Sequence, residues 1–361
     1  MPSVKAQALE TFVRDIFLAA GCSAEESARI GRSLVGANLA GHDSHGVARV
    51  PRYVAWKQEG TFFADRTVKV VVDTPALAVV DGQFGFGQST APQAVKIGIE
   101  KCKAMGIAAV ALRKSGHVGR VGEWAEMAAA AGLVSVHFVN VAGSVLVAPF
   151  GGVDRRFSTA PFCVGIPRPG GEPMILDFAT SLVAEGKVFV ASQGGKKLPP
   201  NALVTQDGET SADPHVLYGD YRPDGPRDYK SGTGAIRAFG EHKGSGLALM
   251  CELLGGSLTG NGGSEFDVPW SQGMFSFYVD PARVDPEQFF PADVTRMVAF
   301  VKSAKPVAAG GEVLVPGEPE RRTRQDRLAN GVPLPDDTWS SLVLVARELG
   351  LAEDRIKAAA G

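Results

Sequence analysis

Hydrophobic residues at helical spacing open the chain: they recur three or four positions apart at Ala8, Phe12, Ile16 and Ala19. A capping box at 23–26 then favours a second helix, which we expect to end near Ala40. Pro51 suits the first turn of a third helix that ends near Gly60. The first 60 residues are therefore expected to be helical.

Short valine-rich runs alternate with helical patterns in the middle of the chain. Strands are expected at 68–72, 76–80, 107–112, 133–139, 162–166, 174–177 and 274–279. Helices are expected at 90–105, 120–131 and 242–258, the last of them long and apolar. This alternation predicts an α/β core with at least some parallel strand pairing.

The pattern returns to helices after residue 285, with expected elements at 292–301, 320–330 and 337–349. Helices at both ends predict a discontinuous helical domain, residues 1–75 plus 286–361, around an α/β domain at 76–285. The segment 202–233 is rich in proline and glycine, so we expect a long functional loop or flap there.

Composition narrows the class of protein. The 361 residues are 45% hydrophobic and 21% charged, which is typical of a globular chain. A net charge of -2 without a basic run argues against nucleic acid, and no apolar stretch is long enough for a membrane span. The four cysteines show no metal or disulfide spacing, so a reduced, cytoplasmic protein is expected.

The stretch from His42 to Arg49 carries the most chemical information. His45 and Arg49 stand four positions apart, which places them on one face if the segment is a helix. Histidine transfers protons near neutral pH, and the arginine fork binds a carboxylate through two hydrogen bonds. Ser44 is beside the histidine and can orient its ring. An ordinary surface turn is the alternative interpretation.

A second motif, at 115–122, lies between an expected strand and an expected helix. Ligands bind at such positions in α/β folds, because backbone amides and the helix N-terminus face the ligand there. His117 in this motif is a second candidate for proton transfer. A glycine-rich turn with an exposed histidine is the alternative.

Three further motifs are candidates for a cofactor site. His242 and Lys243 open the long apolar helix and suit a phosphate group, unless they only cap that helix. Asp177 ends a strand and can accept hydrogen bonds from ribose hydroxyls, while Thr180 or Ser181 can cap the next helix. A turn at 316–319 precedes a basic helix. The G-x-G-x-x-G fingerprint is absent, and no third ligand accompanies His42 and His45, so no metal is expected.

These motifs, in this order, resemble the malate/L-lactate dehydrogenase family of the second, non-Rossmann type. The matching stretches are 43–46 through Tyr53, 117–119, 177–181, 242–244 and 316–318. The resemblance implies a mixed-sheet α/β core, as in L-sulfolactate dehydrogenase, with a discontinuous helical domain built from both termini. It also implies that residues 76–285 bind the cofactor, and that the protein is a homodimer with this site near the subunit interface.

The resemblance further implies hydride transfer between NAD(H), with NADP as an alternative, and a 2-hydroxy or 2-oxo acid of the phenylpyruvate, hydroxyphenylpyruvate, lactate or malate type. On this basis His45, His117 and Ser44 are the catalytic candidates, and Arg49 and Tyr53 bind substrate. The expected cofactor contacts are Asn140, Asp177, Phe178, Ala179, Thr180, Ser181, His242, Lys243, Gly317 and Glu318.

Several alternatives stay open at this point. The motifs do not decide whether His45 or His117 transfers the proton. The chain departs from the family at 158–161, where Ser-Thr-Ala-Pro replaces the frequent Gly-Thr-Asn-Pro. A cyclic-imine reductase, acting on piperideine-2-carboxylate or pyrroline-2-carboxylate, is the alternative within the family. A cofactor-free lyase or isomerase of hydroxy acids, using two histidines, is the alternative from another class.

Overall fold

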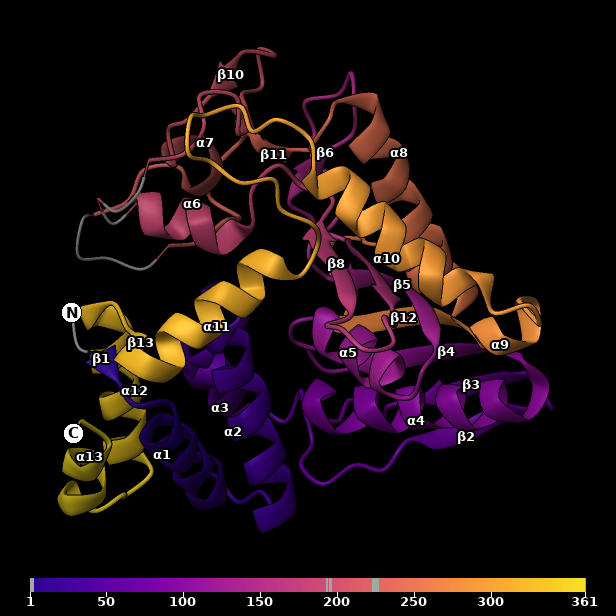
Figure 1. The fold of residues 1–361 in the computed structure, drawn as a ribbon. Coiled ribbons are helices and arrows are strands. Elements are labelled where there is room, and N and C mark those ends of the chain that lie inside the picture. Colours follow the sequence, from indigo (N-terminus) through magenta and orange to yellow (C-terminus); the bar gives the residue numbers. More distant parts are fainter. Residues whose placement is uncertain (1–2, 193, 195–196, 223–226, 361) are drawn as a thin grey trace.

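Three main clusters of buried hydrophobic residues organise the molecule, one in a helical part, one beside a large sheet and one in a small outer part. The computed structural model describes residues 3–192, 194, 197–222 and 227–360. Figure 1 shows the helical part on the left, the large sheet on the right and the small outer part at the top. The candidate site lies where the helical part meets the sheet.

The helical part joins both ends of the chain. Its helices are α1 (Ala6–Ala19), α2 (Ala24–Leu39), α3 (Val50–Gln58), α12 (Asp336–Glu348) and α13 (Glu353–Ala360). The short strand β1 (Ser3–Val4) pairs antiparallel with β13 (Val332–Pro333). The three expected N-terminal helices are confirmed, and the Ser23 side chain accepts a hydrogen bond from the Glu26 amide as the N-cap of α2.

The large sheet has seven strands in the order β2-β3-β4-β12-β5-β7-β8. Their bounds are β2 (Lys69–Asp73), β3 (Leu77–Asp81), β4 (Ile107–Ser115), β5 (Val134–Ala142), β7 (Pro161–Ile166), β8 (Met174–Ala179) and β12 (Ser271–Val279). Strands β3 and β4 pair in parallel, and the other neighbours pair antiparallel. The late strand β12 lies between β4 and β5, which makes the sheet mixed rather than doubly wound.

Helices cover both faces of this sheet. On one face lie α4 (Gly87–Met105) and α5 (Gly122–Ala130), and on the other lies α8 (His242–Cys251) (Figure 1). The expected long helix at 242–258 is confirmed, but its second half is a π-helix, η3 (Glu252–Leu258), which packs on β5 and β12. The short helix α9 (Pro281–Val284) and the longer helix α10 (Phe289–Lys302) complete this region.

The expected loop at 202–233 is confirmed in part: most of its described residues lie outside helices and strands, but two short strands and one short helix attach the segment to the small outer part. Its sheet has the order β10-β9-β11-β6, with bounds β6 (Val147–Ala148), β9 (Leu203–Val204), β10 (Thr210–Ser211) and β11 (Ala235–Arg237). Two helices accompany it, α6 (Glu185–Ser192) and α7 (His215–Tyr218). Leu203, Leu217 and Tyr218 are buried there, which explains the ordered packing. Residues 223–226 lie outside the described residues.

Helix α11 (Glu318–Asn330) lies between the helical part and β8 in Figure 1, and it contacts α2. The division into domains at residues 75 and 286 stays a prediction. The structure adds that β2, within the first 75 residues, pairs with β3 of the large sheet.

Candidate active site

Two histidines from different parts of the fold meet at the centre of the site. His45 ends a short 3₁₀ turn, η1 (Asp43–His45), and His117 follows strand β4. Nδ1 of His45 lies 3.2 Å from Nε2 of His117. Their rings are stacked, with centroids 5.1 Å apart and an angle of 5° between the planes. The structure therefore brings together the two histidines that the sequence offered as alternatives.

His45 and Arg49 do not share an α-helical face, and this expectation is wrong. The segment consists of η1 and a second 3₁₀ turn, η2 (Val47–Arg49), separated by an extended Gly46. The cause is Asn38, whose Oδ1 accepts a hydrogen bond of 2.8 Å from the Val47 amide. A Cβ atom on Gly46 would lie 2.2 Å from that oxygen, so only glycine fits.

Tyr53 and Gln88 hold the His117 ring from the side away from His45. The Tyr53 hydroxyl lies 2.5 Å from Nδ1 of His117. Nε2 of Gln88 donates to the Tyr53 hydroxyl at 3.0 Å and to the backbone carbonyl of His117 at 3.2 Å. Both ring nitrogens of His117 are thus engaged within the protein. Within the described residues, Nε2 of His45 has no such partner.

Burial makes both imidazoles neutral at physiological pH. Removal from water lowers the pKa of His45 to about 3, and the nearby Arg49 cation lowers it further. Burial also lowers the pKa of His117 well below its ordinary value, with a smaller effect from His45. Neutral rings can accept a proton, so the pair suits a general base when no anion is bound.

Arg49 presents an open guanidinium beside this pair. Its Nε donates to the Ser44 carbonyl at 2.6 Å, and its terminal nitrogens form no hydrogen bond to another described residue. Those two nitrogens can bind a carboxylate. Ser44 itself lies under helix α6, since a Cβ on Gly186 would be 3.1 Å from the Cβ of Ser44.

The stretch 177–181 is placed by packing and by hydrogen bonds. Asp177 accepts a hydrogen bond of 2.7 Å from the Gly122 amide at the start of α5. The Phe178 ring contacts the Phe239 ring edge-on at 5.3 Å, and Ala179 ends β8. Thr180 donates to the Ala160 carbonyl at 2.8 Å, so it holds the 158–161 turn and does not cap α6.

Ser181 lies beside them, and its buried hydroxyl has no hydrogen-bond partner among the described residues. It does not cap α6 either. An unpartnered buried hydroxyl leaves a polar group free for a ligand.

The structure gives the remaining cofactor candidates no contact with the two histidines. His242 and Lys243 are exposed at the start of α8. Gly317 has a φ of 89° before α11, and Glu318 binds Lys302 at 2.5 Å. Asn140 is buried, and its amide nitrogen donates to the Gly262 carbonyl at 2.7 Å. Their role as cofactor contacts stays a prediction.

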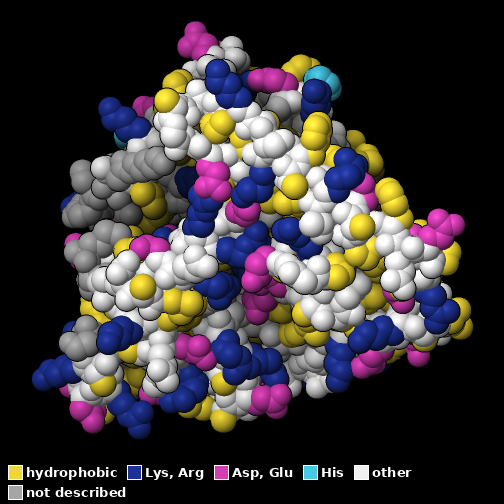
Figure 2. All heavy atoms as spheres, in the orientation of Figure 1, with side chains coloured by type: hydrophobic (Ala, Val, Ile, Leu, Met, Phe, Trp, Pro, Cys, Tyr) yellow, Lys and Arg dark blue, Asp and Glu magenta, His cyan; other side chains and the backbone are white. Residues whose placement is uncertain are grey.

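A cavity of about 370 Å³ lies between α11 and β8. Its lining includes Asp177 and Gly317 from the expected cofactor set, together with His42, Arg120 and Glu320. Figure 2 shows charged side chains of both signs along a hollow near the middle of this face. Sequence reasoning missed Glu320, although it stands directly after the predicted 316–319 turn.

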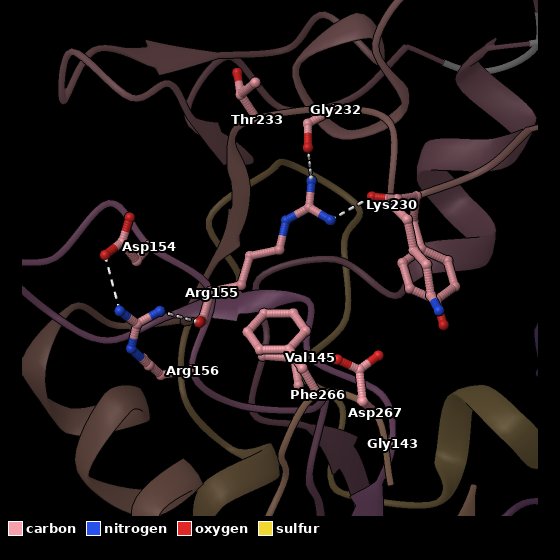
Figure 3. Close-up of a pocket in the computed structure, with 11 residues that line it drawn as sticks. Gly143, Val145, Asp154, Arg155, Arg156, Lys230, Gly232, Thr233, Phe266 and Asp267 are labelled. Atoms are coloured by element: carbon pink, nitrogen blue, oxygen red, sulfur yellow. Dashed lines mark hydrogen bonds and ion pairs between the residues drawn. The ribbon is translucent and has the colours of Figure 1, made fainter. Parts of the chain in front are cut away.

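A second cavity, of about 390 Å³, lies in the outer part of the molecule (Figure 3). Arg155 lines this cavity. The Arg155 guanidinium donates hydrogen bonds to the backbone carbonyls of Leu217, Tyr229, Gly232 and Gly234. The arginine therefore ties the outer loops together. None of the candidate site residues lines this cavity.

The remaining histidines of the sequence have structural surroundings. His137 is buried between the hydroxyls of Ser276, at 2.8 Å, and Ser135, at 3.1 Å. His215 binds Asp213 at 2.8 Å on the surface. No group of three or more potential metal ligands occurs among the described residues, and none of the described helices is long and apolar enough to span a membrane.

Comparison with known proteins agrees with this geometry. The family model described as malate/L-lactate dehydrogenase matches residues 4–343. Hydroxycarboxylate dehydrogenase B of Escherichia coli (strain K12) is 39% identical over 357 residues, which is 98% of this chain and 96% of that protein. The Delta(1)-pyrroline-2-carboxylate/Delta(1)-piperideine-2-carboxylate reductase of Pseudomonas syringae pv. tomato is 32% identical over 89% of each chain. The solved structure of a putative malate/lactate dehydrogenase from E. coli superposes with a TM-score of 0.91 at 37% identity, covering 99% of this chain and 98% of that one.

The chain belongs to the malate/L-lactate dehydrogenase family, and it is an enzyme of the dehydrogenase class. The mixed-sheet, non-Rossmann fold expected from the resemblance is confirmed. Members of this family are NAD(P)-dependent and act on small hydroxy or oxo acids. The family assignment argues against the cofactor-free lyase or isomerase.

Proposed function

We propose that this enzyme transfers a hydride reversibly between NAD(H) and a 2-hydroxy or 2-oxo acid, with His45 as the residue that moves the proton. One observation carries the assignment of the proton: Nε2 of His45 is open, whereas Tyr53 and His45 occupy both ring nitrogens of His117. His117 then acts as a positioning residue that fixes the plane and the orientation of the His45 ring.

Arg49 supplies the recognition of the acid. Its free terminal nitrogens are held near His45 by the Nε contact to the Ser44 carbonyl. A carboxylate bound there carries its C2 oxygen beside the imidazole, since the carboxylate carbon and C2 are directly bonded. In oxidation, the neutral His45 ring takes the proton of the 2-hydroxyl group. In reduction the same ring, protonated, gives a proton to the 2-oxo oxygen.

The bound acid also tunes this histidine. Arg49 is the largest charged influence that lowers the pKa of His45. A carboxylate on Arg49 cancels that influence, so the pKa of His45 rises when the acid binds. Substrate binding thus prepares the ring for proton donation.

The residues present fit a dinucleotide cofactor. The cavity between α11 and β8 contains Asp177, and two buried polar atoms in its walls, Nε of Arg120 and Oε2 of Glu320, have no partner among the described residues. Ser181 adds an unpartnered hydroxyl nearby in sequence. A bound nicotinamide supplies or accepts the hydride at the substrate carbon. We propose NAD as the cofactor because carboxylates line this cavity.

Aromatic side chains beside the histidines favour an acid with an apolar or aromatic side chain. The half-buried Trp270 ring lies 6.3 Å from the His117 ring and 4.7 Å from the Trp56 ring. Such a wall attracts the ring of phenylpyruvate or hydroxyphenylpyruvate by stacking. A cyclic-imine reductase is the second candidate, because the P. syringae reductase is 32% identical to this chain over 89% of its length.

The decisive experiment is a set of initial-rate assays with NADH and NADPH. Phenylpyruvate, hydroxyphenylpyruvate, pyruvate, oxaloacetate and piperideine-2-carboxylate are compared at equal concentrations. We expect the highest kcat/KM with NADH and an aromatic 2-oxo acid. A preference for the cyclic imine would reverse the order of the two candidates. Absence of turnover with every pair, together with absence of dinucleotide binding, would refute the proposal.

We also propose a homodimer, and the exposed apolar residues of α8, η3 and α10 are the surface that supports it. Helix α10 buries only Val294 and Val298 among its residues. The large apolar side chains left exposed on these elements are Leu249, Met250, Leu253, Leu258, Phe289, Met297, Phe300 and Val301. Large apolar side chains left exposed in this number are typical of a surface that another subunit covers. Light scattering of Phe300→Glu against the unmodified protein tests it, with dissociation expected.

A further inference from the structure

We propose that Glu320 selects NAD over NADP by accepting a hydrogen bond from a ribose hydroxyl in the cavity between α11 and β8. This inference rests on the proposed function, and it assigns a specificity-determining role to a side chain outside the recognised motifs.

The cavity is built by elements that are far apart in sequence. Helix α11 contributes Glu320, the turn before η1 contributes His42, and the start of α5 is preceded by Arg120. Nε2 of His42 lies 3.5 Å from Oε1 of Glu320. The Arg120 side chain is only 3% exposed, and its Nη2 donates to Glu126 at 2.6 Å. A ligand here contacts both the helical part and the sheet.

Two buried polar atoms in the residues that line this cavity form no hydrogen bond to a described residue. Nε of Arg120 is a buried donor, and Oε2 of Glu320 is a buried acceptor, and neither has a partner among the described residues. An unsatisfied buried polar atom is costly, so such atoms mark places where a ligand or water completes the structure. A hydroxyl group suits either atom, since it can accept from a guanidinium and donate to a carboxylate. A phosphate ester satisfies only the guanidinium, because its oxygens are acceptors at neutral pH.

The charges of the cavity also favour a ribose hydroxyl over a 2′-phosphate. The contact with His42 lowers the pKa of Glu320, so this carboxyl group is ionised at neutral pH. A dianionic 2′-phosphate beside it would meet direct repulsion. The titratable groups that line the cavity are His42, Arg120, Glu126, Glu172, Asp177, Glu320, Arg321 and Arg324.

Two of the three arginines are already engaged by the protein. Arg120 is bound to Glu126, and Arg321 donates to the Pro173 carbonyl at 3.0 Å. Because the Pro173 carbonyl is neutral, both Arg321 and Arg324 remain as cations against the three carboxyl groups of Glu172, Asp177 and Glu320. The balance therefore favours a neutral hydroxyl over a phosphate at this position.

The test is a measurement of cofactor affinity, with Glu320→Gln as the variant and Glu172→Gln as its control. Both substitutions remove one negative charge from the lining, but Glu172 is exposed and has no buried, unpartnered oxygen. Dissociation constants for NADH and NADPH are determined by fluorescence titration, without any substrate. Thermal unfolding checks that both variants are folded.

We expect the unmodified enzyme to bind NADH more tightly than NADPH. In Glu320→Gln the ratio of the two dissociation constants should shift toward NADPH by about tenfold, which corresponds to roughly 1.4 kcal/mol. In Glu172→Gln the ratio should change less than twofold.

Equal shifts in the two variants would assign the selection to the overall charge and overturn the role of Glu320. An unchanged ratio in Glu320→Gln would also overturn it, and so would equal binding of NADH and NADPH by the unmodified enzyme. In these cases NADH still binds and the proposed function stands. Failure of the unmodified enzyme to bind either dinucleotide would instead refute the proposed function itself.

Discussion

His45 of the helical part and His117, which follows strand β4 of the large sheet, form a stacked pair with 3.2 Å between Nδ1 of His45 and Nε2 of His117. The pair is asymmetric. Nε2 of His45 has no hydrogen-bond partner among the described residues, whereas both ring nitrogens of His117 have one. This asymmetry gives the two residues different expected behaviour on mutation.

Replacement of His45 by Gln should remove proton transfer and lower kcat by about 10²–10⁴-fold. Replacement of His117 by Gln should cost less, because it loosens the His45 ring without removing the group that carries the proton. Steady-state kinetics from pH 6 to 9 measure both effects. If His45→Gln keeps near-normal turnover while His117→Gln loses it, the two roles are exchanged.

Tyr53→Phe separates positioning from chemistry. It removes the hydroxyl that contacts His117 and leaves both histidines in place. We expect a moderate loss in kcat with little change in KM, and a shifted pH profile, because the pKa of His45 depends on how its ring is held. An unchanged pH profile would show that His117 needs no fixed orientation.

Binding of a 2-oxo acid analogue should be accompanied by proton uptake. The pKa of His45 is about 3 without an anion nearby, owing to burial and to Arg49. Neutralisation of Arg49 by the analogue's carboxylate raises that pKa, so protons bind as the complex forms. Calorimetric titration with oxamate and NADH in buffers of different ionisation enthalpy measures the number of protons. The Arg49→Met variant serves as the control, and equal proton uptake there would contradict this coupling.

Arg49→Met should also weaken acid binding directly. Loss of a charge-assisted hydrogen-bond pair costs about 1.5–3 kcal/mol, which raises KM roughly 10- to 100-fold. Arg52→Met is a matched control, because Arg52 is exposed nearby on α3, where its guanidinium lies 5.0 Å from the Trp56 ring. A similar KM for both variants would remove Arg49 from the substrate site.

The enzyme should lose stability as the pH falls from about 7 toward 5. Burial lowers the pKa of His45, of His117 and of His137, the last to about 3. Below pH 6.5 the unfolded chain binds protons at these histidines and the folded protein does not, so the free energy of unfolding decreases. Each histidine contributes a slope of about 1.4 kcal/mol per pH unit in this range.

Urea unfolding of the His137→Gln variant isolates one of these contributions, because His137 lies in the sheet, away from the site. Its free energy of unfolding should depend less steeply on pH, by the slope that one proton contributes, about 1.4 kcal/mol per pH unit. The same slope as in the unmodified protein would mean that His137 titrates normally when folded.

Substitution by alanine should have opposite effects on protein stability at Gly46 and at Gly36. A Cβ on Gly46 collides with the Asn38 side chain, whereas a Cβ on Gly36, within α2, meets nothing within 4 Å. We expect Gly46→Ala to destabilise the protein by about 1–3 kcal/mol and to lower activity by moving His45. Gly36→Ala should stabilise it by about 0.4–1 kcal/mol and leave activity unchanged. Thermal unfolding and kcat measurements compare the two.

The sequence predicts the helices and strands of this fold well, because their periodicity is regular and glycine ends several of them. It does not predict where β12 lies, since the pairing of residues 271–279 with both β4 and β5 depends on tertiary packing. The short strands and the short helix within the proline- and glycine-rich segment at 202–233 are not predicted either, for a related reason. Turn-forming residues there connect very short strands, whose apolar residues are buried in pairs rather than in long runs.

The candidate site, too, is predicted only in part, because its geometry depends on tertiary contacts. The sequence points to His45, His117 and Arg49 because histidine and arginine have distinctive chemistry, but it places His45 and Arg49 on a regular helix that Asn38 and Gly46 interrupt. Gln88 carries no local signal at all. Its amide matters only because α4 brings it within 3.0 Å of Tyr53.

The pairing of β1 with β13 has a consequence for synthesis of the chain. Because Ser3 and Val4 bind residues 332 and 333, and Phe12 contacts Trp339, the helical part is incomplete until residues 332–339 have left the ribosome. Nascent α1, α2 and α3 must keep their apolar faces uncovered during translation of about 270 intervening residues. A circular permutant that joins the old ends and opens the chain elsewhere would bring these helices together early, and it should fold with less aggregation.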